Sequence, residues 1–513
     1  MRFRGPLADS YAAAALLVVF ALVPYLVLTS AIAPLQQVIS KSVGLNPQAL
    51  ENTTGMANAG YAFGTVLAVQ LAVRLRPRRL LLAYAVLLVC GSVMTALAST
   101  PGIFIAGHVL QGLCTSLMLI AAVPPLVTGW PAKRMPITAG VMNLCIFGAV
   151  ALGPVVGNLE AGAHAWRPLF WMATGASAVA LLFVLLTWED DPAPEHPGRW
   201  DIPSLTLAAG GCAAAFFGAS ELTTHRMLSV IVFVPLLCGL GAIVILVIHQ
   251  SIVQDPLVPV RKLFSTKPLA GVMVAMAAGA SSVPAIDLVG QAISTSGTPV
   301  HLASLFWPFF GGAVVMAVVF GITLRTRMLA ALVFIGLAVL AGGIAVTTGV
   351  AHGPHSLVAV GSGLIGVGVG AAVAPALFIA GFSLPSSQIQ RVFALVELLR
   401  AVAAFMTAPV ILHLALSTNG GLMGAGVSTG LWVCFAIAST GLVVALYVFV
   451  LGRARLQQPD IDTWQEGKSP AWFSPPLANG IRTRRVTGQG ATATVSRRAS
   501  AETASRSSSP WST

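Results

Sequence analysis

Charged residues are scarce in this sequence. Only 9% of its 513 residues are Asp, Glu, Lys or Arg, and 56% are hydrophobic, whereas about a quarter of the residues in a typical soluble domain are charged. The mean hydropathy is +0.87. This composition excludes a soluble globular protein and indicates one that crosses a lipid bilayer many times.

Patterns typical of enzymes, metal sites and disulfides are absent too. The six cysteines each stand singly in an apolar run, without the paired spacing of a zinc or redox site. There is no His-rich cluster, no Ser-His-Asp set and no phosphate-binding loop. We therefore expect neither an enzyme nor an ATP-driven pump, and we expect no cofactor and no metal.

Apolar runs of about 20 residues, the length that crosses the bilayer core, recur along the chain. They predict an all-α polytopic membrane protein with fourteen transmembrane helices. We place these helices at residues 11–33, 55–75, 80–97, 102–126, 137–156, 169–187, 202–220, 228–249, 269–289, 304–324, 329–350, 357–382, 393–414 and 426–451.

Basic residues concentrate in every second connection between these helices. If the N-terminus is cytoplasmic, the external loops hold only Lys41, Arg167 and Arg226. Short cytoplasmic loops of membrane proteins retain Lys and Arg, so both termini are predicted to be cytoplasmic. The net charge of +12 therefore reflects orientation in the membrane, and we expect no nucleic-acid partner.

Changes in composition divide the chain into parts. A cytoplasmic linker at residues 188–201, WEDDPAPEHPGRWD, separates an N-terminal six-helix bundle (1–187) from two inserted helices (202–250). A C-terminal six-helix bundle (251–456) follows, and two such bundles place a substrate cavity between them near the midplane. The apolar pattern then stops, and we expect residues 457–513 to be a disordered cytoplasmic tail, because they have almost nothing to bury.

The most specific pattern lies in residues 140–171. An apolar run there carries glycines in its second half and ends in a Trp-Arg-Pro corner. Glycines at this spacing let a second helix approach closely, and a proline bends its helix. The residues that we expect to support this close packing are Gly148, Gly153, Pro154 and Gly157.

This stretch resembles the antiporter signature of the major facilitator superfamily, with Ala149 and Asn158 at two of its glycine positions. Further resemblances lie in helix 2 with the loop after it, in helix 4, and before helices 7 and 9. They are carried by residues 61–64, the basic run Arg74, Arg76, Arg78 and Arg79, residues 108–112, residues 200–201 and residues 255–259. The last two are similar to the 14-helix drug:proton antiporter branch. The resemblance implies a multidrug efflux transporter with two six-helix bundles plus two inserted helices.

Three departures from the family pattern bear on the mechanism. Tyr25 stands where that branch has a buried Asp in helix 1. Val73 and Arg76 replace an acid and a glycine of the loop signature, so only its basic part, Arg74, Arg78 and Arg79, carries over as a candidate for conformational control. His108 replaces an Arg of helix 4 and can gain or lose a proton near neutral pH.

A proton-coupled transporter needs an ionisable group inside the membrane, where such groups are functional candidates by default. We consider Asp287, His108, Glu397 and Arg400 as proton-coupling candidates. For each a purely structural interpretation stays open. Asp287 could lie exposed at the external helix mouth, His108 could be a satisfied core residue, and Glu397 with Arg400 three residues later could form an ion pair.

Aromatic and small polar side chains within the helices are candidates for lining the substrate cavity, and packing is the alternative for each. They are Tyr25, Asn58, Tyr61, Gln111, Asn143, Trp307 and Phe310. With so few buried charges, an amphiphilic or neutral organic substrate fits better than a multiply charged one.

We therefore predict a secondary active transporter that exports hydrophobic or amphiphilic small molecules by alternating access in exchange for protons. Its expected location is the cytoplasmic membrane of a bacterium, where it acts as a monomer. Two alternatives keep the same fold: a dedicated exporter of one endogenous metabolite, and a member that is not coupled to protons or acts as a sensor.

Overall fold

The computed structural model describes residues 4–189, 200–254, 256–295, 302–349, 355–418 and 425–477, and these are helical and otherwise irregular apart from two isolated bridges. The helices are α1 Tyr11–Val43, α2 Pro47–Ala72, α3 Pro77–Ala96, α4 Pro101–Thr128, α5 Met135–Asn143, α6 Ala149–Gly162, α7 Arg167–Leu186, α8 Ile202–Ser220, α9 Val230–Ile252, α10 Val260–Leu263, α11 Thr266–Thr295, α12 Leu302–Thr323, α13 Leu329–Thr347, α14 His355–Phe382, α15 Ile389–Ser417, α16 Ala425–Leu451 and α17 Ile461–Gln465.

The described chain has fourteen helical spans of membrane length, which confirms the predicted fold class. One span is built jointly by α5, the π-helical turn Leu144–Gly148 and α6. Thirteen of the spans are also apolar enough to cross a membrane by composition. The remaining one, α2, has 26 residues but begins with a polar stretch. That stretch lies against other protein segments rather than lipid, because Gln48 and Asn52 bond to residues at the end of α8 and just beyond it.

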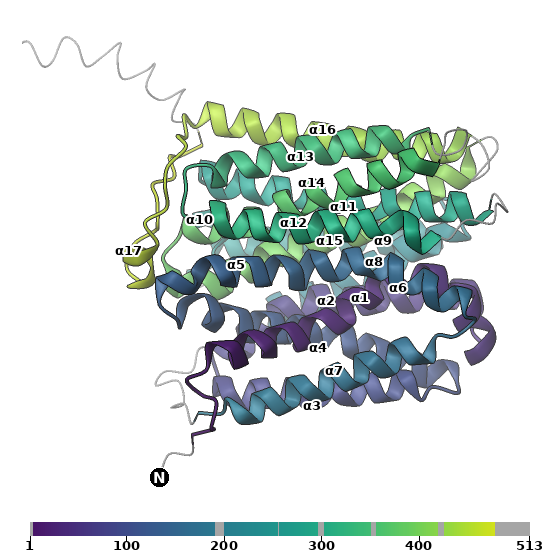
Figure 1. Ribbon diagram of the computed structural model, residues 1–513, viewed down its shortest axis with the longest axis horizontal. Coiled ribbons are helices and arrows are strands. Elements are labelled where there is room, and N and C mark those ends of the chain that lie inside the picture. The colour runs from purple at the N-terminus through teal and green to yellow at the C-terminus, as the bar shows by residue number, and fades with distance from the viewer. Residues whose placement is uncertain are drawn as a thin grey trace, which may run out of the picture.

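The helices form two groups that lie side by side (Figure 1). In the first, α1 packs on α4, α6 and α7, and α4 packs on α2 and α3. In the second, α11 packs on α14, α15 and α16, and α14 packs on α12 and α13. We call these groups the N-bundle and the C-bundle. They meet where α12 contacts α5 and α6 and where α2 contacts α15, while α8, paired with α9, packs on both α2 and α15.

Close helix packing in the N-bundle centres on Gly153 and Pro154 of α6. A Cβ atom added at Gly153 would overlap the Ser30 hydroxyl of α1. A proline has no N–H, so the carbonyl four residues earlier loses its partner within the helix. That carbonyl belongs to Val150, and Ser30 Oγ donates a hydrogen bond of 2.7 Å to it. The glycine admits α1, and the proline supplies the acceptor that holds it there.

The other two glycines of this motif differ from each other. A Cβ atom at Gly157 would lie 2.6 Å from the carbonyl oxygen of Ala31 on α1, so α1 and α6 stay close there as well. At Gly148 an added Cβ would meet only the side chain of Leu144 in the same span. Gly148 therefore does not admit a neighbouring helix; it ends the π-helical turn.

Residues 457–477 are ordered, so the prediction of a disordered tail is wrong for them. They run along the end of the C-bundle from which the chain emerges, and include α17 (Figure 1). Trp464 is fully buried and donates a 2.8 Å hydrogen bond to the Leu384 carbonyl, while Trp472 donates one of 2.9 Å to Ser383 Oγ. The two buried tryptophan rings and their hydrogen bonds hold this segment against the C-bundle. The rest of the predicted tail, residues 478–513, and most of the predicted linker, residues 190–199, lie outside the described residues.

Candidate functional site

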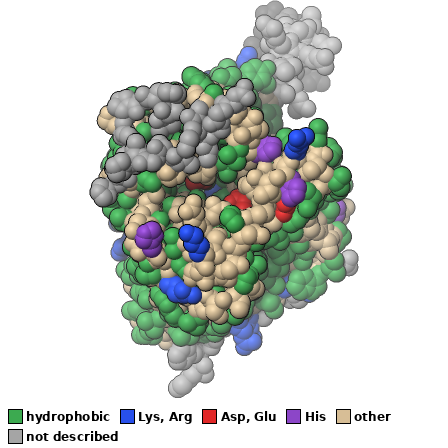
Figure 2. Space-filling view, turned by 90° about the vertical axis from the view of Figure 1, so that its right-hand side faces the viewer, with side chains coloured by type: hydrophobic (Ala, Val, Ile, Leu, Met, Phe, Trp, Pro, Cys, Tyr) green, Lys and Arg blue, Asp and Glu red, His purple; other side chains and the backbone are tan. Residues whose placement is uncertain are grey.

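A cavity of about 310 Å³ opens between the bundles at the end of the molecule opposite to both described chain ends. The distribution of basic residues makes this the external end. Its walls come from the second half of α1, the first turns of α2, and the external parts of α8, α11 and α15. Figure 2 shows this face, with acidic side chains in a central hollow. A volume of this size is in the range of small-molecule sites.

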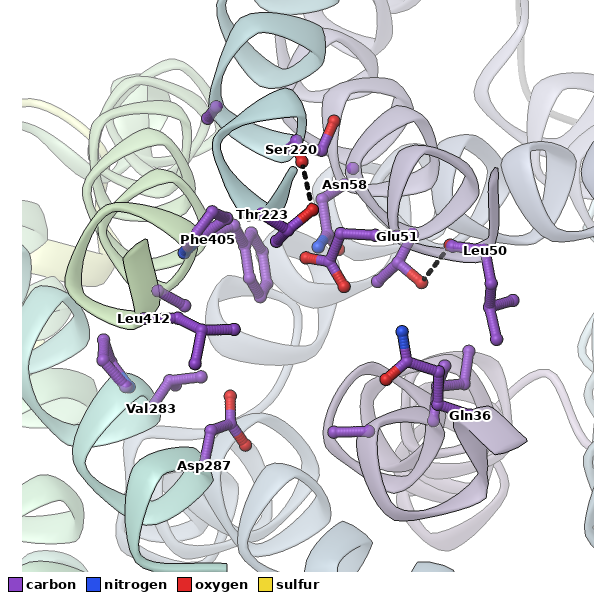
Figure 3. A pocket seen from close by; sticks show the side chains of 18 of the residues that line it. Gln36, Leu50, Glu51, Asn58, Ser220, Thr223, Val283, Asp287, Phe405 and Leu412 are labelled. Atoms are coloured by element: carbon purple, nitrogen blue, oxygen red, sulfur yellow. Dashed lines mark hydrogen bonds between the residues drawn. The ribbon is translucent and has the colours of Figure 1, made fainter. Parts of the chain in front are cut away.

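Two carboxyl groups from opposite bundles point into the cavity. Asp287 comes from α11 and Glu51 from α2, and both side chains face the open space in Figure 3. Among the described residues that line the cavity, none is Lys, Arg or His. The remaining polar lining consists of amide and hydroxyl side chains, among them Gln36, Asn58 and Thr223. The cavity is therefore acidic and otherwise uncharged.

Glu51 was missed by the sequence prediction, which began the second span at residue 55 and so left Glu51 in a loop. A signal for the earlier start is present. The side chain of Asn46 accepts a 2.6 Å hydrogen bond from the backbone of Ala49, and Pro47 opens the helix. Asn before Pro is a favourable helix beginning, and it could have placed Glu51 in the second turn of α2.

A buried polar network lies next to the cavity and joins the two bundles. Tyr25 donates a 3.0 Å hydrogen bond to Asn58, which lines the cavity, and its ring stacks on that of Tyr61. Tyr61 on α2 donates a 2.7 Å hydrogen bond to Glu397 on α15. Glu397 in turn accepts from Arg400, at 2.9 Å for the Nε atom, and both side chains are buried. Glu397 and Arg400 thus form an ion pair that also contacts the N-bundle.

The span of α5 and α6 makes further contacts between the bundles around its π-helical turn. Asn143, just before the turn, donates a 3.0 Å hydrogen bond to the Gly370 carbonyl of α14. Arg400 lies 5.6 Å from the ring centre of Phe147, within the turn. A π turn shifts the residues around it relative to a regular helix. Here it lies where Asn143 and Phe147 both meet the C-bundle.

His108 lies inside the N-bundle, away from the residues that line the cavity. It is 1% exposed, and its Nδ1 atom is 3.2 Å from the side-chain oxygen of Gln111. Gln111 also donates to Ser92 at 3.0 Å. The rings of Tyr25 and Phe104 flank the imidazole, with centroids 5.6 and 6.0 Å away. This placement is that of a core histidine with polar and aromatic neighbours.

Of the residues predicted to line a substrate cavity, Asn58 lines this external cavity. Tyr25 and Tyr61 lie behind it, while Gln111 and Asn143 are used in packing within or between the bundles. Trp307 and Phe310 do not line this cavity. They pack on each other with ring centroids 6.0 Å apart, and Trp307 is 50% exposed on the surface of α12. No described residue of α12 lines the cavity. On the side of the C-bundle, its walls come from α11 and α15.

The basic run after α2 lies at the cytoplasmic end. The guanidinium of Arg74 lies 4.6 Å from the ring centre of Trp200, at the start of the segment that leads into α8. Nearby, Gln70 accepts a 3.1 Å hydrogen bond from the backbone of Asp201. Arg78 is partly buried and Arg79 is exposed. The described contacts of Arg74 thus connect α2 to the inserted helices.

Residues 17–408 match the Major Facilitator Superfamily. This is most of the chain. The chain belongs to this superfamily. It is therefore a multi-pass membrane protein of a transporter family that is not enzymatic.

Relatives of this major facilitator protein are bacterial, and their similarity is partial. The uncharacterized MFS-type transporter YubD of Bacillus subtilis is 25% identical over 274 residues, covering 52% of this chain and 53% of its own. The lincomycin resistance protein LmrB of Listeria innocua is 25% identical over 173 residues, covering 34% and 36%. The chain thus spans about half or less of the length of the relatives it matches.

Solved structures of the superfamily share the fold at low identity. The human organic anion transporter MFSD10 superposes with a TM-score of 0.58 at 14% identity, covering 85% of this chain and 99% of that one. A POT family transporter in complex with a thioalcohol-conjugated peptide gives 0.61 at 14% identity, covering 87% and 96%. These similarities establish the fold of this chain. They do not indicate its substrate, which we infer below from the cavity.

Proposed function

We propose that this facilitator exports amphiphilic small molecules from the cytoplasm in exchange for protons, as a member of the 14-helix drug:proton antiporter branch. The observation that carries the proposal is the carboxyl group of Asp287 inside an external cavity between the two bundles. The fourteen spans agree with that branch. The similarity to a lincomycin resistance protein supports a drug-like substrate. The cavity lies between the two bundles of one chain, and we propose that the transporter acts as a monomer.

The structure corresponds to the outward-facing stage of such a cycle. The cavity is at the external end, whereas polar contacts between the bundles lie farther toward the cytoplasm, such as Asn143 with Gly370 and Gln390 with the Ile120 carbonyl at 3.2 Å. In this stage Asp287 can release substrate and take a proton from outside. Opening toward the cytoplasm requires these contacts to break while the cavity walls approach each other.

Other ionisable groups near Asp287 limit which of them can carry the proton. Glu51 shares the cavity, Cys434 of α16 is a buried neighbour, and the pair of Glu397 and Arg400 lies on α15. Glu397 already accepts hydrogen bonds from Arg400 and Tyr61, and it does not line the cavity. We therefore assign proton exchange to Asp287 and a structural role in joining the bundles to Glu397.

Proteoliposomes with an imposed pH gradient test this proposal. Efflux of an amphiphilic dye should follow the size of the gradient in the wild-type protein. An efflux rate that does not depend on the gradient would refute proton coupling and favour an uncoupled exporter. Tyr25, which stands where the branch has a buried Asp, agrees with that alternative. No transport of any organic compound would refute the exporter and favour a sensor.

A further inference from the structure

We infer that the external cavity selects organic cations, which it holds between the carboxylates of Asp287 and Glu51. This inference rests on the proposed transport function and names the substrate class of the same site. The ligand chemistry is a single positive charge on an apolar or aromatic body.

The charge of the cavity carries the inference. Two carboxyl groups point into it, and none of its described lining residues is basic. Three described basic residues of the external face, Lys41, His164 and Arg167, line a separate pocket between α1 and the beginning of α7. A recess that bears charge of one sign raises the local concentration of ions of the opposite sign. An organic anion would meet two carboxylates there and no cationic partner among the described lining residues.

The apolar lining suits the body of such a ligand. Phe216 of α8 and Phe405 of α15 offer aromatic rings, and Ile32, Leu288 and Leu412 offer aliphatic surface. Aromatic rings attract cations through their faces, and Phe405 also touches Tyr61 edge-on at 6.3 Å between centroids. A cation seated in the cavity therefore contacts a ring that lies directly against the network joining the bundles.

The two carboxylates also belong to opposite bundles, which ties the ligand charge to conformational change. Glu51 moves with the N-bundle and Asp287 with the C-bundle. Their repulsion opposes closure of the external mouth, and it grows as water leaves the narrowing space. A cation or a proton between them removes that repulsion. Closure of the external mouth is therefore favoured when a substrate cation or a proton occupies the site. Exchange of substrate for protons requires this dependence on occupancy.

Binding of two ions with the same shape and opposite charge tests the inference. Tetraphenylphosphonium and tetraphenylborate are measured by equilibrium dialysis at pH 8 against the full protein in nanodiscs, with protein-free nanodiscs subtracted. We expect tetraphenylphosphonium to bind at least about tenfold more tightly. Equal binding, or a preference for tetraphenylborate, would overturn the inference without the use of any variant.

Variants test whether Glu51 and Asp287 cause the preference for the cation. Glu51→Gln and Asp287→Asn should each lower tetraphenylphosphonium affinity, and the double variant should bind the two ions alike. Glu160→Gln removes an external acid that does not line the cavity and should leave binding unchanged. A preference that persists in the double variant would overturn the assignment. Different results would refute the proposed function and this inference. Binding of the cation without gradient-driven efflux would refute export, whereas gradient-driven efflux of tetraphenylborate would refute cation selectivity.

A different observation, the ordered end of the chain, supports a second inference. We propose that residues 457–477 form a strap that holds the cytoplasmic ends of the two bundles together. The strap is fixed to the C-bundle, where the Thr266 amide donates a 3.0 Å hydrogen bond to the Pro475 carbonyl. Lys267 Nζ donates to Gln457 at 2.9 Å and lies 4.3 Å from the ring centre of Trp472.

The strap then reaches the other bundle through α17. The side chain of Gln465 donates a 3.0 Å hydrogen bond to the carbonyl of Trp130, which follows α4 in the N-bundle. The Trp130 ring packs edge-on against Tyr11 at the start of α1, with centroids 5.5 Å apart. Because an inward-facing state separates the cytoplasmic ends of the bundles, this bond breaks in that state. The strap therefore favours the outward-facing state.

Distances between spin labels on the two bundles test the strap. Spin labels are placed at Arg76→Cys and Arg327→Cys, both exposed at cytoplasmic helix ends. The exposed native cysteines, Cys90 and Cys238, are first replaced by Ser, and the distances are measured by double electron–electron resonance. Gln465→Ala should raise the long-distance population roughly fivefold, the effect of one net hydrogen bond. Gln458→Ala, an exposed change on the same segment, should not. An unchanged distribution in Gln465→Ala would overturn the strap.

Discussion

Tyr61 on α2 donates a 2.7 Å hydrogen bond to Glu397 on α15, and this buried bond joins the two bundles of the transporter. Glu397 is held at the same time by Arg400. The bond lies next to the external cavity, because Tyr61 touches Phe405 of the cavity wall. Changes in the cavity can therefore reach the contact between the bundles through two adjacent aromatic rings.

Removal of the Tyr61 hydroxyl should weaken the outward-facing state. Tyr61→Phe takes away a hydrogen bond to a charged group, worth about 1.5 to 3 kcal/mol, but keeps the ring. We expect a cysteine at Thr29, in the cavity wall, to react roughly tenfold more slowly with an external, membrane-impermeant maleimide. Tyr84→Phe is the matched control, because the Tyr84 hydroxyl is buried without a hydrogen-bond partner. Equal labelling of the Tyr61→Phe variant and the wild type would show that this bond does not hold the state.

The ion pair of Glu397 and Arg400 should be sensitive to the loss of one partner. Glu397→Gln leaves a buried arginine without its carboxylate, and such changes destabilise by about 3 to 5 kcal/mol. The double variant Glu397→Gln, Arg400→Met leaves no uncompensated charge and should regain most of the lost thermal stability. The measurement is thermal unfolding in detergent. A double variant as unstable as Glu397→Gln would argue against the pair as the source of the effect.

Asp287 should be required for coupling but not for folding. Asp287→Asn keeps the size of the side chain and removes its titration, so we expect the variant to be assembled normally and to lose gradient-driven efflux. The readouts are size-exclusion behaviour and dye efflux in proteoliposomes. Asp9→Asn, an exposed acid before α1, serves as control. Wild-type coupling in Asp287→Asn would remove this residue from the mechanism.

The contact between α1 and α6 should not tolerate a larger side chain. Gly153→Leu would drive atoms into Ser30 and the backbone of α1, and overpacking of this kind costs about 1 to 3 kcal/mol or more. We expect a lower yield of folded protein and loss of transport. Gly175→Leu on α7, where an added Cβ meets no atom within 4 Å, should be tolerated. Normal yield and activity in Gly153→Leu would contradict tight packing.

The tryptophans of the strap should matter for stability. Trp464→Ala removes a fully buried ring from the contact with Phe382, and such truncations destabilise by about 3 to 5 kcal/mol. The midpoint of thermal unfolding should fall by several degrees. Phe473→Ala, in which the lost ring is 67% exposed, should have little effect. If both variants unfolded like the wild type, the strap would contribute nothing to folding.

The helices could be predicted because a spanning helix needs a certain length and an apolar composition. Both are properties of one continuous run of residues and do not depend on the rest of the chain. Errors arose where protein, not lipid, surrounds a helix. The polar start of α2 was assigned to a loop, although Asn52 bonds to Glu221 at 2.7 Å there. The strap was assigned to disorder because the apolar pattern stops after Leu456 and the residues beyond it have almost nothing to bury by composition.

The amino-acid sequence by itself determined that this protein crosses the membrane about fourteen times with cytoplasmic ends, because hydropathy and basic residues act locally. It also placed Asp287, His108, Glu397 and Arg400 within the spans, but it left Glu51 in a loop. Only the tertiary structure decided their partners: Asp287 with Glu51 in an acidic cavity, Glu397 with Tyr61 and Arg400 between the bundles, and His108 in a core. These pairings join residues up to 336 positions apart in the chain, and no local pattern encodes which helices meet.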